Sequence, residues 1–164
     1  RSALQTASHD AAVYVPGPDV LVSVSNYSLT QAVSVFDFSD AKWKALPCPP
    51  HNPYPIHSHA MSALGDYVLL YGGYTKEGRS QATWVLDTRR WVWRELAKTS
   101  EGRGEAGQTT VLGKIAPYRW GHSLHHAGDG MFVVFGGYDG QSFANDVWIF
   151  RSGTAGRAGE QEGR

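Results

Sequence analysis

The chain has 164 residues, and its 15 Lys and Arg side chains balance its 15 Asp and Glu side chains, so the formal net charge is zero. This balance removes the main electrostatic reason to expect a nucleic acid or an anionic membrane as a partner. No apolar run approaches the ~20 residues of a membrane-spanning helix. The chain holds 19 Gly and 6 Trp at only 18% charged residues, which is typical of a turn-rich β protein, and its single Cys48 excludes an internal disulfide.

The sequence repeats itself about every fifty to sixty-four residues. The segment from Val35 to Trp43 recurs fifty positions later, from Val85 to Trp93, with Val, Asp and Trp at matching places. The run Tyr71–Tyr74 recurs sixty-four positions later as Phe135–Tyr138, and both runs contain a glycine pair. Three copies of one unit therefore account for nearly the whole chain.

In chain order, each unit is predicted to form four short antiparallel strands, a to d. The a strands begin near Ala11, Ser58 and His122. The b strands of the last two units, residues 67–71 and 131–135, are short apolar runs that fit strands buried on both faces. The c strands carry Trp84 or Trp148 and the d strands carry Trp43 or Trp93, whereas the third unit shows no strand d.

The combined pattern resembles a kelch repeat. It runs from Arg119-x-Gly121-His122-Ser123 through a Gly-Asp turn and Phe132–Tyr138 to Asn145-Asp146-Val147-Trp148. The resemblance implies an all-β fold made of β-propeller blades, each a four-stranded antiparallel meander. We expect a partial propeller over residues 1–152, with blades at about 8–46, 54–98 and 117–151, and a disordered tail over 153–164.

The number of blades predicts an incomplete ring. Propellers close with four to eight blades, and closure protects their sheet edges. With about three blades, we expect this segment to belong to a longer chain and to be unstable as a lone monomer. The alternative is that several copies associate to complete a ring.

The seven histidines do not form a recognisable metal motif. His59 and His122 occupy the same repeat position, where a structural role in hydrogen bonding between blades explains them better than metal binding. Galactose oxidase, a copper enzyme, also has a kelch-like propeller, but its Tyr/His motif is not recognisable around Cys48. Phosphate-binding loops, nucleophile elbows and paired carboxylates are also missing. We therefore predict a non-enzymatic protein without metal, cofactor or catalytic residues.

Protein binding is the function that the loops favour. In a meander, the b–c and d–a loops lie at one rim of the propeller, and Tyr and Arg are enriched at interface anchors. We predict that a protein partner binds this rim, whereas this segment contacts neither nucleic acid nor membrane. The candidate partner-binding residues are Tyr54, Tyr74, Lys76, Arg79, Arg119, Tyr138, Asp139 and Gln141.

The first unit bears on the cellular setting. Asn26-Tyr27-Ser28 is an N-glycosylation sequon on a predicted loop. Together with Ala7-Ser8-His9, Asp37 and Trp43, it resembles an early blade of the attractin and multiple-EGF-domain group. That resemblance implies a glycoprotein at the cell surface, beside EGF-like domains. The alternative is a cytoplasmic adaptor, such as a ubiquitin-ligase substrate receptor or a cytoskeletal scaffold.

Overall fold

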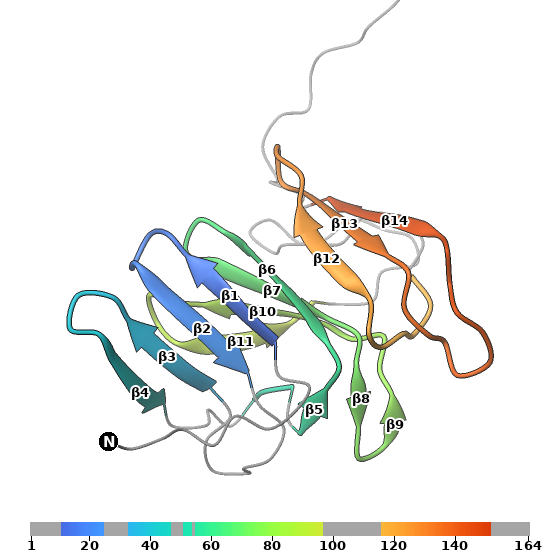
Figure 1. The fold of residues 1–164 in the computed structure, drawn as a ribbon, viewed down its shortest axis with the longest axis horizontal. Helices are drawn as coiled ribbons and strands as arrows, with labels where there is room; N and C mark the ends of the chain where they lie inside the picture. Colours follow the sequence, from blue (N-terminus) through green and yellow to red (C-terminus); the bar gives the residue numbers. More distant parts are fainter. Residues whose placement is uncertain (1–10, 25–32, 47–50, 54, 97–115, 152–164) are drawn as a thin grey trace, which may run out of the picture.

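The structure is a computed structural model that describes residues 11–24, 33–46, 51–53, 55–96 and 116–151. These residues form strands and turns, with no helix among them. They build three larger antiparallel sheets and one small sheet (Figure 1). Within the described ranges, no helix is long and apolar enough to cross a membrane. The prediction of an all-β chain of antiparallel meanders is therefore confirmed.

The first sheet is a four-stranded meander in chain order. Valines alternate along its inner strands, so that one face is a continuous buried surface of Val15, Val22, Val24 and Val35. Its strands are β1 (Ala11–Val15), β2 (Val20–Val24), β3 (Val33–Asp37) and β4 (Lys42–Leu46).

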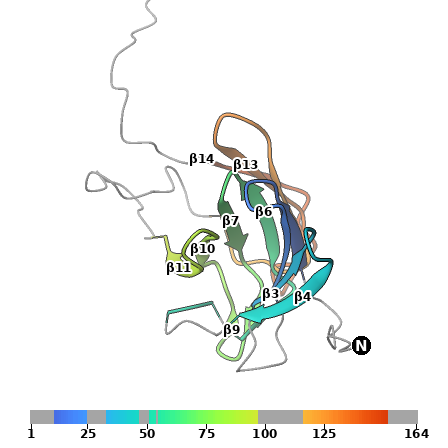
Figure 2. The same cartoon turned by 90° about the vertical axis from the view of Figure 1, so that its left-hand side faces the viewer.

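The second sheet has the same a-to-d order. Asp87 closes the turn between its last two strands, because its carboxylate accepts hydrogen bonds from the backbone N–H groups of Arg89 and Arg90 at 2.9 and 3.2 Å. Figure 2 shows the strand order β11-β10-β7-β6 from left to right. These strands are β6 (Ala60–Leu64), β7 (Tyr67–Tyr71), β10 (Thr83–Asp87) and β11 (Val92–Glu95).

The third sheet has three strands within the described residues. They are β12 (Ser123–His126), β13 (Met131–Phe135) and β14 (Val147–Arg151). The predicted lack of a strand d concerns the residues after Arg151, which the structure does not describe. The tail predicted for residues 153–164 lies outside the part of the chain that the structure describes.

The three sheets stack face to face, with β1, β6 and β12 side by side. Val68 and Leu70 of β7 pack against the first sheet, while Leu69 and Tyr71 of the same strand pack against the third. The predicted burial on both faces is thus correct for β7. It is wrong for β13, where Phe135 is 52% exposed, because no described strand covers the far side of the third sheet.

Glycine is required in the glycine pairs because another backbone segment approaches them closely. Gly73 and Gly137 both have a φ of +93°. A Cβ atom at Gly73 would lie 2.7 Å from the carbonyl oxygen of His57, and one at Gly137 would lie 2.9 Å from that of Trp120. Any larger residue would therefore force the segment that leads into strand a of the same blade away from the end of strand b.

His59 and His122 are buried between the sheets. Neither imidazole has a hydrogen-bond partner among the described residues, so the expected hydrogen bonding between blades is not observed. His122 instead packs edge-to-face on the ring of Tyr71, with centroids 5.2 Å apart. Burial is the main reason why the pKa of each imidazole falls to about 4.

These histidines predict a loss of stability in mild acid. The pKa of each of these histidines is about 6.5 in the unfolded chain and about 4 in the folded chain. Unfolding therefore takes up protons between pH 6.5 and pH 4. The free energy of unfolding is therefore expected to fall as the pH drops from 6.5 to 4, by on the order of 3 kcal/mol for each histidine. Urea unfolding, repeated at one protein concentration across this pH range, measures the change in the free energy of unfolding. His122→Gln should flatten the slope, and an unchanged slope would contradict the assignment.

Candidate functional site

The b–c and d–a loops gather at one end of the sheets, at the bottom of Figure 1. We call this end the loop face; its described segments are 51–53, 55–59, 72–82, 116–122 and 136–146. The sequence predicted only loops here, but part of the loop face is a small sheet. Its strands are β5 (Ile56–His57), β8 (Tyr74–Thr75) and β9 (Gly78–Arg79). This sheet gives partners to backbone groups that would otherwise bond only to water.

The same arrangement recurs in the third unit. Tyr138 forms antiparallel bridges with both Trp120 and Phe143. These three residues match His57, Tyr74 and Arg79 of the small sheet, within one position of the repeat spacing. The loop face is therefore built from two equivalent arrangements of three paired segments, and in each the middle segment directly follows a glycine pair.

Aromatic rings form a continuous row across these two edges. His57 stacks on Tyr74 with ring centroids 5.4 Å apart, and Tyr74 meets Trp120 edge-to-face at 5.6 Å. Trp120 contacts Tyr138, which contacts Phe143, in both cases with centroids 5.0 Å apart. The row crosses from one blade to the next, and its last member, Phe143, is 86% exposed.

Arg79 joins the two blades beside this row. Its guanidinium donates a hydrogen bond to the carbonyl oxygen of Asp139 in the next blade, and it lies 5.1 Å from the centroid of the Tyr118 ring. A Cβ atom at Gly140 would collide with this guanidinium. Arg79 therefore holds the two b–c loops together, in addition to being exposed as expected.

Arg119 was expected among the exposed rim residues, and the structure corrects this. It is 2% exposed, because its guanidinium points inward to the Asp146 carboxylate, at 2.7 and 3.0 Å, and to the carbonyl oxygen of Gly136 at 2.9 Å. The hydrogen bonds from Arg119 lower the pKa of Asp146 to about 2. This ion pair, in which the guanidinium is buried and the carboxylate is partly exposed, fixes the loop that carries Trp120 rather than meeting a partner.

The remaining predicted site residues differ in their exposure. Tyr74, Lys76 and Gln141 are exposed on the loop face, and Tyr138 is half-buried within the aromatic row. Asp139 is half-buried, and its carboxylate accepts the backbone N–H groups of Gln141 and Ser142, which lower its pKa. This carboxylate closes a turn. Tyr54 and Asn26 lie outside the described residues.

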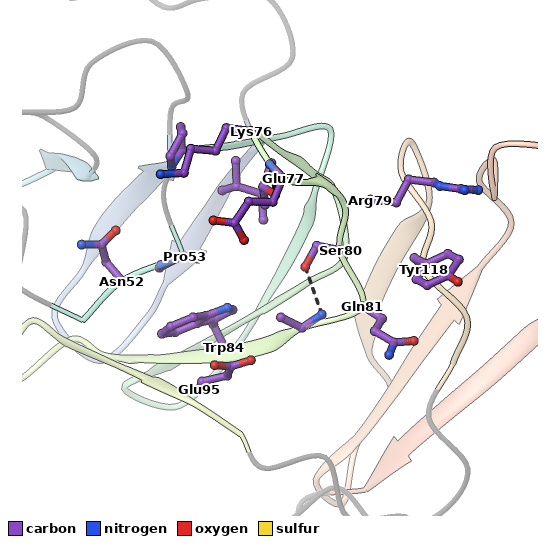
Figure 3. Close-up of a pocket in the computed structure, with 14 residues that line it drawn as sticks. Asn52, Pro53, Lys76, Glu77, Arg79, Ser80, Gln81, Trp84, Glu95 and Tyr118 are labelled. Carbon is purple, nitrogen blue, oxygen red and sulfur yellow. Dashed lines mark hydrogen bonds between the residues drawn. The ribbon is translucent and has the colours of Figure 1, made fainter.

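A pocket of about 500 Å³ opens beside the row, on the second blade (Figure 3). Trp84 and Glu95 lie together on one side, and the Glu77 carboxylate points toward them from the β8–β9 turn. Asn52, Pro53 and Lys76 line it as well. Its size suits one or two side chains of a partner. Among the described residues, no group of three or more His, Cys, Asp and Glu comes close enough to hold a metal ion.

Neither Trp120 nor Phe143 was among the partner-binding residues predicted from the sequence. The repeat spacing of sixty-four residues offered a signal. It places the equivalent of Arg79 at Phe143 and the equivalent of His57 one position from Trp120. Comparing the loops by register, rather than by residue type, would have found them.

The Arg119–Asp146 pair predicts that removing one charge destabilises the chain. Asp146→Asn leaves the buried guanidinium without its counter-charge, and because the Asp146 side chain is 43% exposed we expect a loss on the order of 2 kcal/mol, below that of a fully buried pair. Urea unfolding measures this, with Asp129→Asn in an exposed turn as the control that should change little. Equal stability of the two variants would contradict a structural role for the pair.

Comparisons with known proteins agree with this architecture. Residues 5–157 match the family model described as the KLHDC2/KLHL20/DRC7 Kelch-repeats domain. A putative F-box/kelch-repeat protein of Arabidopsis thaliana is 36% identical over 88 residues, which cover 52% of this chain and 23% of that protein. Kelch-like protein 24a of Danio rerio is 26% identical over 114 residues, covering 70% of this chain and 15% of that protein.

A flagellar outer-arm dynein alpha chain of Chlamydomonas reinhardtii is 30% identical over 105 residues, covering 60% of this chain and 2% of that protein. The chain thus spans less than a quarter of the length of each of these relatives. None of these matches supports the resemblance to the attractin group. The family model covers nearly the whole chain, so the chain belongs to the kelch-repeat family.

Proposed function

We propose that this chain is a non-enzymatic protein-binding module that holds a segment of a partner protein on its loop face. The observation that carries the proposal is the aromatic row from His57 to Phe143. Kelch domains generally bind protein partners, which supports the class of function. The use of this particular face is our own inference.

The aromatic row has the properties of an interface anchor. Tyr74 and Phe143 are 39% and 86% exposed, while their neighbours Trp120 and Tyr138 hold them in place by ring contacts. Large aromatic side chains with few rotatable bonds lose little entropy on binding and present wide apolar surfaces. The row therefore suits an extended partner segment with apolar side chains.

The pocket beside the row gives the partner a second contact. Glu77, Glu95 and the Trp84 ring line it. The described residues form no ion pair with either carboxylate. A cationic side chain of the partner would be stabilised there by both carboxylates and by the face of the indole ring. The proposed ligand thus combines apolar side chains with a Lys or Arg.

A peptide selection tests this proposal. Peptides selected from a random displayed library against the 164-residue chain are expected to lose at least tenfold in affinity when Tyr74 and Phe143 are both changed to Ala, because exposed aromatic anchors contribute most of the binding energy. Fluorescence anisotropy with the selected peptides measures the loss.

The matched control changes Tyr67 and Val92 to Ala. These residues are 51% and 47% exposed but follow turns at the other end of the second sheet. Affinity should be unchanged in this control. The proposal is wrong if the selected peptides bind the loop-face variant normally and lose affinity for the control.

The cellular setting is a separate part of the proposal. The relatives reported above are an F-box/kelch-repeat protein, a Kelch-like protein and a dynein chain, and none carries an attractin name. We propose the cytoplasmic adaptor as the setting, in place of the cell-surface glycoprotein that the first unit resembled. In that setting, the sequon at Asn26 carries no glycan.

Glycosidase treatment distinguishes the two settings. The protein isolated from its own cells is expected to keep its electrophoretic mobility after treatment with peptide N-glycosidase, since N-glycosylation requires entry into the secretory pathway. The control is the same chain secreted behind an added signal peptide, whose mobility should shift unless Asn26 is changed to Gln. A shift in the native protein would place it in the secretory pathway instead.

A further inference from the structure

We propose that Arg79 is a positioning residue of the loop face: it holds the turn at Asp139 in the place where a partner meets the aromatic row. The proposal rests on the proposed function, because it takes the row as the binding surface. The sequence predicted Arg79 as a partner contact, whereas here it acts on the partner through a neighbouring turn. Arg79 lies in the second blade and Asp139 in the third, so their contact lies inside the described stack and does not involve its two outer faces.

Three segments of the loop face meet at the Arg79 guanidinium. Arg79 is the last residue of β9, in the b–c segment of the second blade. Its guanidinium donates a hydrogen bond to the carbonyl oxygen of Asp139, sixty positions later, in the b–c segment of the third blade. The guanidinium carbon also lies 5.1 Å from the centroid of the Tyr118 ring, in the d–a segment between the two blades (Figure 3). One side chain thus connects three segments that are far apart in the sequence.

The turn after Asp139 leaves room for the guanidinium. Gly140 has a φ of +98°, in the region where glycine is favoured. A Cβ atom at this position would lie 2.9 Å from the guanidinium carbon of Arg79, closer than two carbon atoms pack. The Asp139 carboxylate closes the turn, because it accepts the backbone N–H groups of Gln141 and Ser142 at 2.7 and 2.8 Å. The turn therefore has its own internal hydrogen bonds, and Arg79 ties it to the second blade.

The position of this turn matters for the aromatic row. Directly before the turn, the ring of Tyr138 has its centroid 5.0 Å from those of both Trp120 and Phe143. Tyr74, at the other end of these contacts, is the cross-strand neighbour of Arg79 between β8 and β9. Without Arg79, the turn can move relative to Tyr74, and only a fraction of the molecules presents the whole row. The apparent affinity for a partner falls by that fraction.

Rate constants separate a positioning residue from a direct contact. Loss of a direct contact mainly speeds dissociation. Loss of positioning slows association, because fewer free molecules have the turn in place, whereas dissociation is unchanged because the bound partner itself holds the turn. Arg79 is exposed, and interactions at the surface contribute little to overall stability. The effect is therefore expected in the association rate rather than in unfolding.

Hydrogen exchange without any partner tests whether Arg79 holds the turn. The measurement uses the protein at the full length that its own cells produce, with and without Arg79→Ala. Exchange of the backbone N–H groups of Gln141 and Ser142 is expected to be faster in the variant. The internal control is the turn at the other end of the second sheet, where Asp87 accepts the N–H groups of Arg89 and Arg90 in the same way. Exchange in the control turn should be unchanged.

Binding kinetics test whether the turn matters to a partner. Peptides selected against the chain are expected to associate about fivefold more slowly with the Arg79→Ala variant, the size expected from one surface hydrogen bond, and to dissociate at an unchanged rate. Arg90→Ala removes the same charge at the opposite end of the second sheet, so it controls for electrostatic steering and should change neither rate. Faster dissociation with unchanged association would identify a direct contact and overturn the proposal.

The two measurements keep this proposal separate from the proposed function. Unchanged exchange at Gln141 and Ser142 would overturn the role of Arg79, even if the peptides still depend on Tyr74 and Phe143. Peptides that bind independently of Tyr74 and Phe143 would contradict the proposed function instead. Faster exchange together with slower association would support both.

Discussion

The burial of a sheet on both of its faces is the constraint on which this structure depends. Side chains alternate along β7, so Val68 and Leu70 face the first sheet while Leu69 and Tyr71 face the third. A sheet that is apolar on both sides is stabilised by burying each side against a neighbouring sheet. The stacking direction, and hence the alignment of the b–c and d–a loops at one end, follows from this alternation.

The loop face is a product of that alignment. Gly72 and Gly73 let the second blade approach the third so closely that the Gly73 N–H group donates to the carbonyl oxygen of Arg119 at 2.8 Å. The buried guanidinium of Arg119, paired with Asp146, then fixes the chain just before Trp120. The close backbone approach at the glycine pair and the Arg119–Asp146 ion pair thus bring the rings of Tyr74, Trp120 and Tyr138 into one row.

The fold could be predicted from the sequence because the sequence repeats, whereas the arrangement of side chains on the loop face could not be predicted. The offsets between Trp84 and Trp148, and between the glycine pairs, are enough to place the strands. The role of an individual rim residue depends instead on the direction of its side chain. Arg79 and Arg119 look alike in the sequence, yet one bridges two loops at the surface and the other is buried on a carboxylate. Only the positions of Asp139 and Asp146 in space separate these two cases.

Strand β7 has a consequence for how the chain tolerates amino-acid changes. In a stack where each unit contacts only its neighbours, stability is a sum over units and the interfaces between them. A change at Leu69 or Val68 weakens an interface of the sheet that holds the other two together, so both ends lose their common support. A change in β4 or β14 affects only an outer strand. Substitutions at the buried positions of β7 are therefore expected to cost more stability than substitutions at the exposed positions of β4.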